Sequence, residues 1–349
     1  MRTPPLGRDD LAALLDRFAA LRVLVVGDYF LDRYLVMDRA LSEVSLETGL
    51  EARQVVARRS SPGAAGTIVN NLRALGVGAV CIGVLGDDGE GYELLAGLEA
   101  VGADTHLMVR HPALMTPTYI KPMMCEADGS EHELERMDIK NREPLPVEVE
   151  GQIITALHTA LPTVDGVIIS EFIYEPDCGT LTTQVRMALN ALAAAHPSRV
   201  FTVDSRPRIG AYRGMILKPN IREAQAAVGM GDAPDSPAGA EEAGRVLARQ
   251  TGQPVFITAG AQGMLVCEAE RCIQVPTVQP DGPIDTVGAG DSAMAGLTAA
   301  LCAGASPQQA ALVGNLVASV TIRQIGTTGT ATPAQVMEQY DRLADQQGW

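Results

Sequence analysis

Short runs of apolar residues alternate along the chain with longer segments whose apolar residues recur at helical spacing. Arg22–Gly27 (RVLVVG) is a β-branched run that ends in glycine, which is typical of a buried parallel strand. Similar runs predict strands at 78–85, 164–170, 199–204 and 254–258. Helical spacing predicts helices at 11–20, 64–75, 89–101, 180–195, 222–228, 240–251, 288–303, 307–322 and 333–345. Strands separated by helices predict an α/β fold with a mostly parallel central sheet that is covered on both faces.

Two stretches, residues 35–58 and 105–138, interrupt this alternation. Both are polar and β-prone and lack a strong helical period. In the second stretch, residues 116–123 and 131–138 predict antiparallel strands around the turn Ala127-Asp128-Gly129. The chain contains no repeat and no long low-complexity linker, and residues 231–239 predict a loop. We therefore expect residues 1–349 to form a single domain from which the two stretches project as a small β lid.

The charge balance narrows the possible partners. The 349 residues include 27 Lys and Arg against 42 Asp and Glu, a formal net charge of −15. Such a charge repels the phosphate backbone of nucleic acids, and no basic run offsets it locally, so nucleic-acid binding is disfavoured. No window approaches the roughly 18 consecutive apolar residues of a membrane span. Residues 1–10 also lack the apolar run of a secretory leader, so we expect a cytoplasmic protein without membrane contact.

Cysteine and lysine are both sparse. The six cysteines are scattered and form no zinc pattern, so we expect reduced thiols, Cys267 and Cys272 included. The three lysines are Lys121, Lys140 and Lys218. No Gly-Lys pair occurs, which excludes a Walker A loop.

The segment 285–292 (DTVGAGDS) carries the clearest chemical signal, because a helix-forming run follows it directly. Gly288, Ala289 and Gly290 allow the backbone to turn tightly and to approach a ligand. The first N–H groups of the following helix are unpaired and carry partial positive charge, which suits a phosphoryl group. Asp291 can then act as the base for an attacking hydroxyl. Taken alone, the segment is equally compatible with a glycine-rich loop in which Asp291 only caps the helix.

This segment, Asp-Thr-x-Gly-Ala-Gly-Asp, resembles the second signature of the PfkB (ribokinase-like) family of carbohydrate kinases. The resemblance extends from about residue 22 to residue 337. It implies a ribokinase-like three-layer sandwich and ATP-dependent transfer of a phosphoryl group to a sugar hydroxyl, with Mg²⁺ and K⁺ as cofactors. It also implies catalytic roles for Gly288, Ala289, Gly290 and Asp291.

The same resemblance assigns residues to the nucleotide and the cations. Asn220-Ile221-Arg222-Glu223 matches the family element Asn-x-x-Glu, in which Glu223 orders Mg²⁺ through water. The turn after the strand at 254–258 resembles the one that lines the nucleotide site, with Thr258, Gly260 and Gly263. The monovalent-cation loop is implied at four positions: Asp285, Thr286, Gly326 and Thr330.

Sugar-binding residues are expected where the first strand ends, because open α/β sheets bind ligands at the carboxyl edge. Asp32 matches a family aspartate that accepts hydrogen bonds from sugar hydroxyls. Residues 62–67 (PGAAGT) resemble the first family signature, Gly-Gly-x-x-x-Asn, and include Gly63, but Thr67 stands where asparagine is expected. Asn71 follows one turn later, and a threonine hydroxyl does not reproduce the paired geometry of an amide. Glu171 lies where family members carry an acidic sugar contact.

Within the family, the sequence most resembles the heptose-phosphate kinase domain of bifunctional ADP-heptose synthases. The similarity lies in residues 27–34 (GDYFLDRY), in Thr118-Tyr119-Ile120-Lys121 and in Arg136-Met137-Asp138. It implies that Lys121 contacts a phosphate on the substrate. We expect no nucleotidyltransferase half within these 349 residues.

Other functions remain open at this point. A nucleoside kinase of the same fold needs aromatic side chains in the lid, where the sequence offers only Tyr119. The departure at Thr67 leaves room for a non-catalytic sugar-binding regulator. A Rossmann dehydrogenase requires G-x-G-x-x-G after the first strand, and Gly27-Asp28-Tyr29-Phe30 does not provide it. Exposed edges of a lid sheet favour a homodimer that pairs through the lid.

Overall fold

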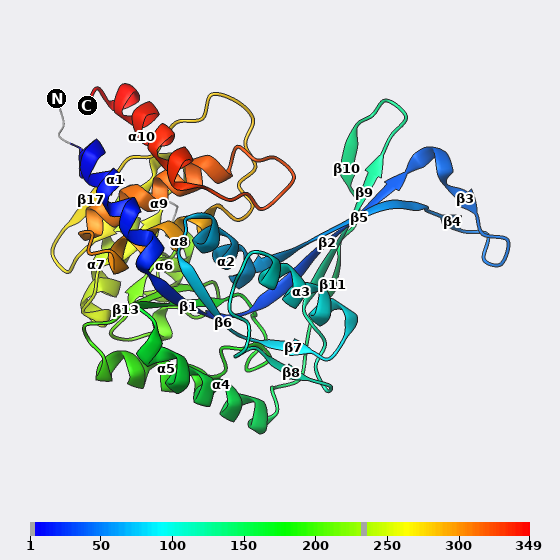
Figure 1. Cartoon of the computed structure of the whole chain (residues 1–349), viewed down its shortest axis with the longest axis horizontal. Coiled ribbons are helices and arrows are strands. Elements are labelled where there is room, and N and C mark those ends of the chain that lie inside the picture. Colours follow the sequence, from blue (N-terminus) through cyan, green and yellow to red (C-terminus); the bar gives the residue numbers. More distant parts are fainter. Residues whose placement is uncertain (1–3, 232–235) are drawn as a thin grey trace.

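The central sheet is mostly parallel and lies between two layers of helices (Figure 1). The computed structural model describes residues 4–231 and 236–349, so residues 232–235 of the loop expected at 231–239 lie outside the described residues. The eight strands run in the order β17-β16-β15-β14-β13-β12-β1-β6. Their bounds are β1 Arg22–Gly27, β6 Gly78–Ile82, β12 Gly166–Glu171, β13 Val200–Ser205, β14 Ile216–Leu217, β15 Val255–Thr258, β16 Met264–Cys267 and β17 Cys272–Val275.

Alternating residues of each buried strand face opposite helical layers. Val23 and Val25 of β1 belong to one core, whereas Leu24 and Val26 belong to the other. The first core is completed by α1 Arg8–Asp16, α2 Ala65–Ala74, α8 Ala289–Cys302, α9 Pro307–Thr321 and α10 Pro333–Gln347. The second is completed by α4 Val147–Ala160, α5 Thr183–Ala195, α6 Ile221–Ala227 and α7 Pro237–Thr251. The three-layer α/β arrangement expected from the sequence is confirmed.

A second sheet projects from this body as a long arm (Figure 1). Its strands run in the order β10-β9-β2-β5, and β11 pairs with β9. Their bounds are β2 Tyr29–Asp38, β5 Val55–Ala64, β9 Thr118–Cys125, β10 Glu131–Glu133 and β11 Met137–Ile139. The short strands β3 Glu43–Val44 and β4 Glu51–Ala52 pair near the far end of the arm. We call this second sheet the lid.

The lid boundaries differ from those expected. β2 begins at Tyr29, two residues after β1 ends, and β5 continues to Ala64 at the start of α2. The lid therefore includes residues 29–34, which lie outside the stretch expected at 35–58. Residues 105–117, which were expected in the lid, do not join it. They contain β8 Val109–His111, and β8 pairs with β7 Val84–Gly86 near α3 Gly89–Ala100.

The cysteine prediction is wrong for one pair. β16 and β17 form an antiparallel hairpin in which Cys267 is the register partner of Cys272, and the two form a disulfide. The other cysteines of the sequence are free thiols. In the described residues no helix is both long and apolar enough to cross a bilayer.

Candidate active site

Charged residues gather where the strands of the central sheet end. Asp28 follows β1, Asp204 lies near the end of β13, and Lys218 follows β14. The N-terminus of α8 reaches this same edge, since Asp204, Lys218 and Asp291 line one cavity. The carboxyl edge therefore carries the expected site.

Three adjoining cavities run along this edge. The acceptor pocket, of about 350 Å³, lies between the lid and α8. The phosphate channel, of about 500 Å³, shares Phe172, Arg206, Gly288 and Asp291 with it. A more apolar cavity of about 250 Å³ shares Thr258, Thr286 and Gly290 with the channel, and we call it the nucleotide pocket. The walls of the phosphate channel are mainly polar, whereas those of the nucleotide pocket are mainly apolar.

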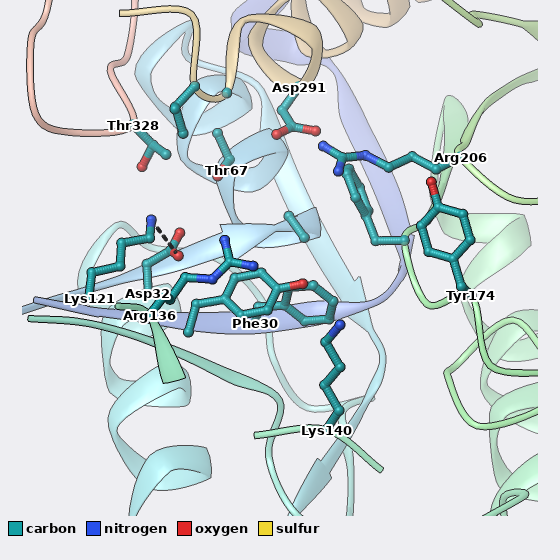
Figure 2. A pocket seen from close by; sticks show the side chains of 15 residues that line it. Phe30, Asp32, Thr67, Lys121, Arg136, Lys140, Tyr174, Arg206, Asp291 and Thr328 are labelled. Atoms are coloured by element: carbon teal, nitrogen blue, oxygen red, sulfur yellow. Dashed lines mark ion pairs between the residues drawn. The ribbon is translucent and has the colours of Figure 1, made fainter. Parts of the chain in front are cut away.

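Asp291 lies where the acceptor pocket meets the phosphate channel (Figure 2). It belongs to the first turn of α8, which follows Gly288 in the left-handed conformation at φ 77°. Burial raises the pKa of Asp291 to about 7, and the nearby Asp204 carboxylate acts in the same direction. A carboxylate with a near-neutral pKa is suited to accept a proton from a hydroxyl.

Lys218 is held beside the start of α8 by a buried ion pair. Its ammonium lies 2.8 Å from Asp204 Oδ2, and both side chains are almost fully enclosed. Burial opposes its charge, but the surrounding carboxylates, Asp204 first among them, raise the pKa of the ammonium. A Cβ placed on Gly290 would lie 3.6 Å from Lys218 Nζ, so the ammonium lies next to the α8 backbone.

Asn220 and Glu223 form a capping box at the start of α6. The Asn220 side chain accepts from the Glu223 N–H at 2.9 Å, and Glu223 Oε2 accepts from the Asn220 N–H at 2.8 Å. Burial, and then the charge of Asp204, raise the pKa of Glu223. In the described chain no three potential ligand side chains are close enough to hold a metal directly. This arrangement fits Mg²⁺, which keeps several waters and binds phosphate oxygens.

The predicted nucleotide and cation residues fall in two neighbouring places. Thr258, Gly260 and Gly263 line the nucleotide pocket together with Thr286. Asp285 joins two loops, because its carboxylate accepts from the N–H of Val287 at 3.0 Å and of Gly326 at 3.1 Å. Thr330 instead pairs through its backbone with Gln324, so the structure brings together Asp285, Thr286 and Gly326 more closely than Thr330.

Asp32 and Lys121 form one wall of the acceptor pocket (Figure 2). Lys121 Nζ lies 2.9 Å from Asp32 Oδ1 and donates to the Tyr34 hydroxyl at 3.1 Å. β2 and β9 place them together, because Asp32 and Lys121 lie on adjacent parallel strands. A Cβ at Gly63 would collide with the Asp32 carboxylate, so Gly63 makes room for it without itself lining the cavity.

Thr67 also faces the acceptor pocket, and its hydroxyl is unsatisfied. The side chain is 1% exposed, and its Oγ1 is buried without a hydrogen-bond partner in the described protein. A buried hydroxyl without a partner costs free energy unless a ligand satisfies it. Ala64, on the same segment, adopts φ 53°, a conformation that favours glycine. The site thus holds one strained residue and one unpaired hydroxyl.

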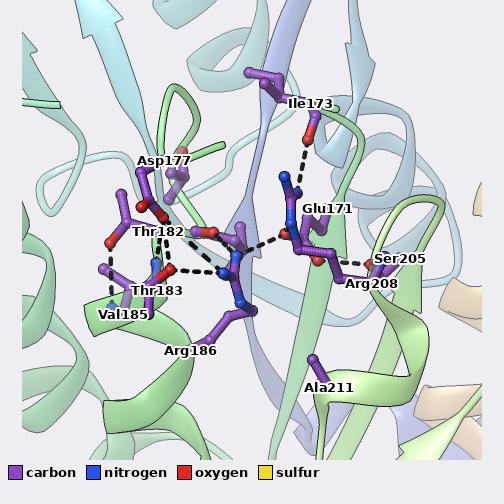
Figure 3. A network of polar contacts seen from close by, with 12 residues as sticks. Glu171, Ile173, Asp177, Thr182, Thr183, Val185, Arg186, Ser205, Arg208 and Ala211 are labelled. Atoms are coloured by element: carbon purple, nitrogen blue, oxygen red, sulfur yellow. Dashed lines mark hydrogen bonds and ion pairs between the residues drawn. The ribbon is translucent and has the colours of Figure 1, made fainter. Parts of the chain in front are cut away.

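Two predicted sugar contacts lie outside the acceptor pocket. Asn71 is fully buried and donates to the carbonyls of Thr67 and Gly329, so it ties α2 to the loop that carries Thr328. Glu171 is also fully buried, and its carboxylate accepts from Arg186, Arg208, Ser205 and Tyr212 (Figure 3). Each of these donors would compete with a sugar for the same carboxylate oxygens. In this structure Glu171 therefore holds neighbouring segments together and does not face the acceptor pocket.

Sequence reasoning missed several lining residues of the acceptor pocket. Four aromatic side chains contribute: Tyr119, which the sequence singled out in the lid, and Phe30, Phe172 and Tyr174, to which it assigned no role. Lys140, Arg206 and Thr328 were also missed, whereas Arg136 had been noted only as part of a motif. The signal that could have found Lys140 and Arg206 is position, because one follows β11 and the other follows β13.

Comparisons with known proteins agree with this geometry. Residues 22–335 match the family model described as pfkB family carbohydrate kinase. The bifunctional protein HldE of Caulobacter vibrioides is 33% identical over 354 residues, which cover 97% of this chain and 69% of that protein. HldE of Trichlorobacter lovleyi is 29% identical over 332 residues, which cover 95% of this chain and 65% of that protein. The chain spans about two thirds of the length of these curated relatives.

Solved structures share the fold at low sequence identity. Phosphofructokinase-2 from Escherichia coli in complex with potassium superposes with a TM-score of 0.69 at 20% identity, covering 93% of this chain and 99% of that one. Arabidopsis thaliana ribokinase complexed with ribose and ATP superposes with a TM-score of 0.64 at 16% identity, covering 91% and 98%.

Proposed function

This chain belongs to the pfkB family of carbohydrate kinases, and from that premise we propose that it transfers the γ-phosphoryl group of ATP to a hydroxyl of a sugar phosphate. The observation that carries the proposal is the place of Asp291, between a cation-rich acceptor pocket and a phosphate channel. Its pKa of about 7 leaves a substantial fraction of the carboxylate ionised at neutral pH.

In this mechanism Asp291 takes the proton of the acceptor hydroxyl as the oxygen attacks phosphorus. The free N–H groups at the start of α8 stabilise the negative charge on the transferring group. Lys218, kept cationic by Asp204, lies beside them. Glu223 would hold Mg²⁺ through water, and the bound ion would neutralise charge on the ATP phosphates.

The acceptor pocket supports a substrate that already carries a phosphate. Arg136 and Lys140 share one carboxylate, because both contact Asp138, at 2.7 and 3.8 Å. Two positive charges therefore face one close carboxylate at this end of the pocket, where a phosphate can bind. Lys121 is neutralised by Asp32, so we assign it the role of orienting that aspartate toward the sugar hydroxyls.

The other candidate functions are less well supported. Four aromatic rings in the pocket favour a nucleoside, but cations already cover two of their faces. Arg136 lies 4.3 Å from the Tyr119 ring centre and Arg206 lies 4.6 Å from that of Phe172. A non-catalytic regulator has no use for a carboxylate with a near-neutral pKa at the head of a phosphate channel.

The test is ADP release from ATP with a panel of sugars, sugar phosphates and nucleosides. We expect turnover with at least one sugar phosphate and a weaker response to the same sugar without its phosphate. Turnover with nucleosides alone, or sugar binding without any turnover, would contradict the proposal. Replacing K⁺ with a large organic cation in the same assay tests the proposed monovalent-cation loop at Asp285 and Gly326.

We further propose a homodimer that pairs through the lid. The lid exposes a cluster of large apolar side chains near its far end, with Val44 66%, Leu46 103% and Leu50 70% exposed. Burying such a cluster between two copies removes apolar surface from water. Light scattering of the purified protein should give twice the mass of one chain. The Leu46→Lys variant should give the mass of a single chain.

A further inference from the structure

Arg206 lies at the junction of the acceptor pocket and the phosphate channel and lines both (Figure 2). We propose that Arg206 is a further catalytic residue, whose guanidinium binds the phosphoryl group while it passes from ATP to the acceptor. This inference rests on the proposed kinase function. It concerns the charge that appears on the phosphoryl group during transfer. The two lysines nearby, Lys121 and Lys218, are each paired with an aspartate.

The charge of Arg206 is available, unlike that of its neighbours. Lys218 is paired with Asp204, and Lys121 is paired with Asp32. Within residues 4–231 and 236–349, the Arg206 side chain makes no ion pair with a carboxylate, and it is exposed to the cavities. Guanidinium groups bind phosphate oxygens through paired N–H donors, so this arginine can contact two oxygens at once.

Ring stacking and a backbone hydrogen bond hold the arginine in place. Its guanidinium lies 4.6 Å from the centre of the Phe172 ring, on which it stacks. Its backbone N–H donates to the Glu171 carbonyl at 3.1 Å. In Figure 2 the guanidinium points toward Asp291. A donor fixed in this way needs little reorganisation when charge develops beside it.

The segment that carries Phe172 is itself clamped from two sides. Asp28 accepts hydrogen bonds from the N–H groups of Phe172 at 2.8 Å and Ile173 at 3.0 Å. Arg208 donates to the carbonyls of Ile173 at 3.1 Å and Tyr174 at 2.8 Å (Figure 3). Buried charges at both edges of the backbone therefore fix the platform on which Arg206 stacks.

The transfer step balances without any change in Arg206. Asp291 accepts the proton of the hydroxyl, the acceptor oxygen bonds to the γ-phosphorus, and the bond from that phosphorus to the β–γ bridging oxygen breaks. The electron pair of the broken bond leaves with ADP. In between, negative charge spreads over the three equatorial oxygens of the phosphoryl group, and the guanidinium binds these oxygens.

The experiment compares wild type with Arg206→Gln, Arg206→Lys and Arg206→Ala, and uses Arg142→Gln as the matched control. Arg142 is 75% exposed and lines neither pocket. We expect kcat of Arg206→Gln to fall about 100- to 1,000-fold with little change in the affinity for ADP. Arg206→Lys should lose nearly as much, and free guanidinium should restore part of the kcat of Arg206→Ala. Thermal melts of all four variants should match wild type.

Two further measurements separate catalysis from scaffolding. The positive charge of Arg206 lowers the pKa of Asp291, so the acid limb of the kcat/KM profile should move to higher pH in Arg206→Gln. That variant should also lose affinity for ADP with aluminium fluoride, a mimic of the transferring phosphoryl, while keeping its affinity for ADP.

The outcomes are distinct. A wild-type kcat in Arg206→Gln, or a higher KM for the sugar phosphate at unchanged kcat, overturns the inference and leaves the kinase function standing. Absence of wild-type turnover with every acceptor overturns the proposed function, and this inference with it.

Discussion

The phosphate channel and the acceptor pocket meet at Asp291 but are built on opposite plans. The channel is formed by the central sheet and α8, and its charges are buried, with Asp204 7% and Lys218 3% exposed. The acceptor pocket includes side chains of the lid strands β2, β5 and β9, and its rim cations Arg136 and Lys140 lie just before and just after β11. Under the proposed function, the transfer chemistry would thus rest on the backbone of the central body, whereas substrate choice would rest to a large extent on side chains of a separate sheet.

The largest effect should follow from removing the base on the channel side. Asp291→Asn keeps the size of the side chain but removes the proton acceptor, so kcat should fall by roughly 100- to 10,000-fold. ATP binding, measured by calorimetry, should change little. Full activity in this variant would refute the assignment of the base.

On the acceptor side, a double change should affect binding instead of turnover. Arg136→Gln with Lys140→Gln removes both positive charges near Asp138, so KM for the sugar phosphate should rise about 10- to 100-fold, in keeping with a loss of about 1.5–3 kcal/mol. The value of kcat at saturation should stay within a few-fold of wild type. An equal rise in KM for the unphosphorylated sugar would show that these cations do not contact a phosphate.

The pH profile distinguishes the two regions a second time. With a pKa of about 7, Asp291 is protonated as the pH falls, so kcat/KM should decrease by up to tenfold per pH unit below about 7. Asp204→Asn removes a negative charge that raises the pKa of Asp291. The acid limb of the kcat/KM profile should therefore move to lower pH. The double variant Arg136→Gln with Lys140→Gln serves as the control. An equal shift in its pH profile would argue against the Asp204 charge as the cause.

The smallest effect should come from Thr67, at the floor of the acceptor pocket. Thr67→Val removes a hydroxyl that has no partner in the described protein, so the melting temperature should stay the same or rise slightly. If a sugar hydroxyl binds there, KM should rise by about 2- to 10-fold, equivalent to about 0.5–1.5 kcal/mol. An unchanged KM would remove Thr67 from the sugar contacts.

The sequence predicted the channel better than the pocket, for a physical reason. The glycine-rich turn and the helix start to which we assign binding of the phosphoryl group lie within one contiguous segment, so the motif at 285–292 suffices to predict them. The pocket joins residues of β2, β5, β9, α2 and α8 with residues that follow β12 and β13, and its members are adjacent only in space. The only local signal of Arg206 and Lys140 is their position after a strand, and it is weak because a single cation after a strand is usual on any surface.

Glu171 illustrates the reverse error. Its position after a buried run matched that of a family sugar contact, but Arg186 and Arg208 arrive from distant segments and occupy its carboxylate. Helix α4 and the hairpin of β16 and β17 were also missed, and the missed hairpin concealed the register that pairs Cys267 with Cys272. These features depend on which strand lies beside which, and the order of residues alone does not specify that.

The lid is joined to the body at points that lie directly beside the acceptor pocket. β2 begins at Tyr29, only two residues beyond β1, and its ten residues extend about 30 Å at roughly 3.3 Å per residue. Asp32 is three residues from that root, so it lies about a third of the way along a lever whose far end is Asp38. If the lid swings as a rigid lever, the Asp32 carboxylate moves through only about a third of the distance that the tip travels. Any motion of the arm would therefore be largest at its tip and smallest beside the acceptor pocket.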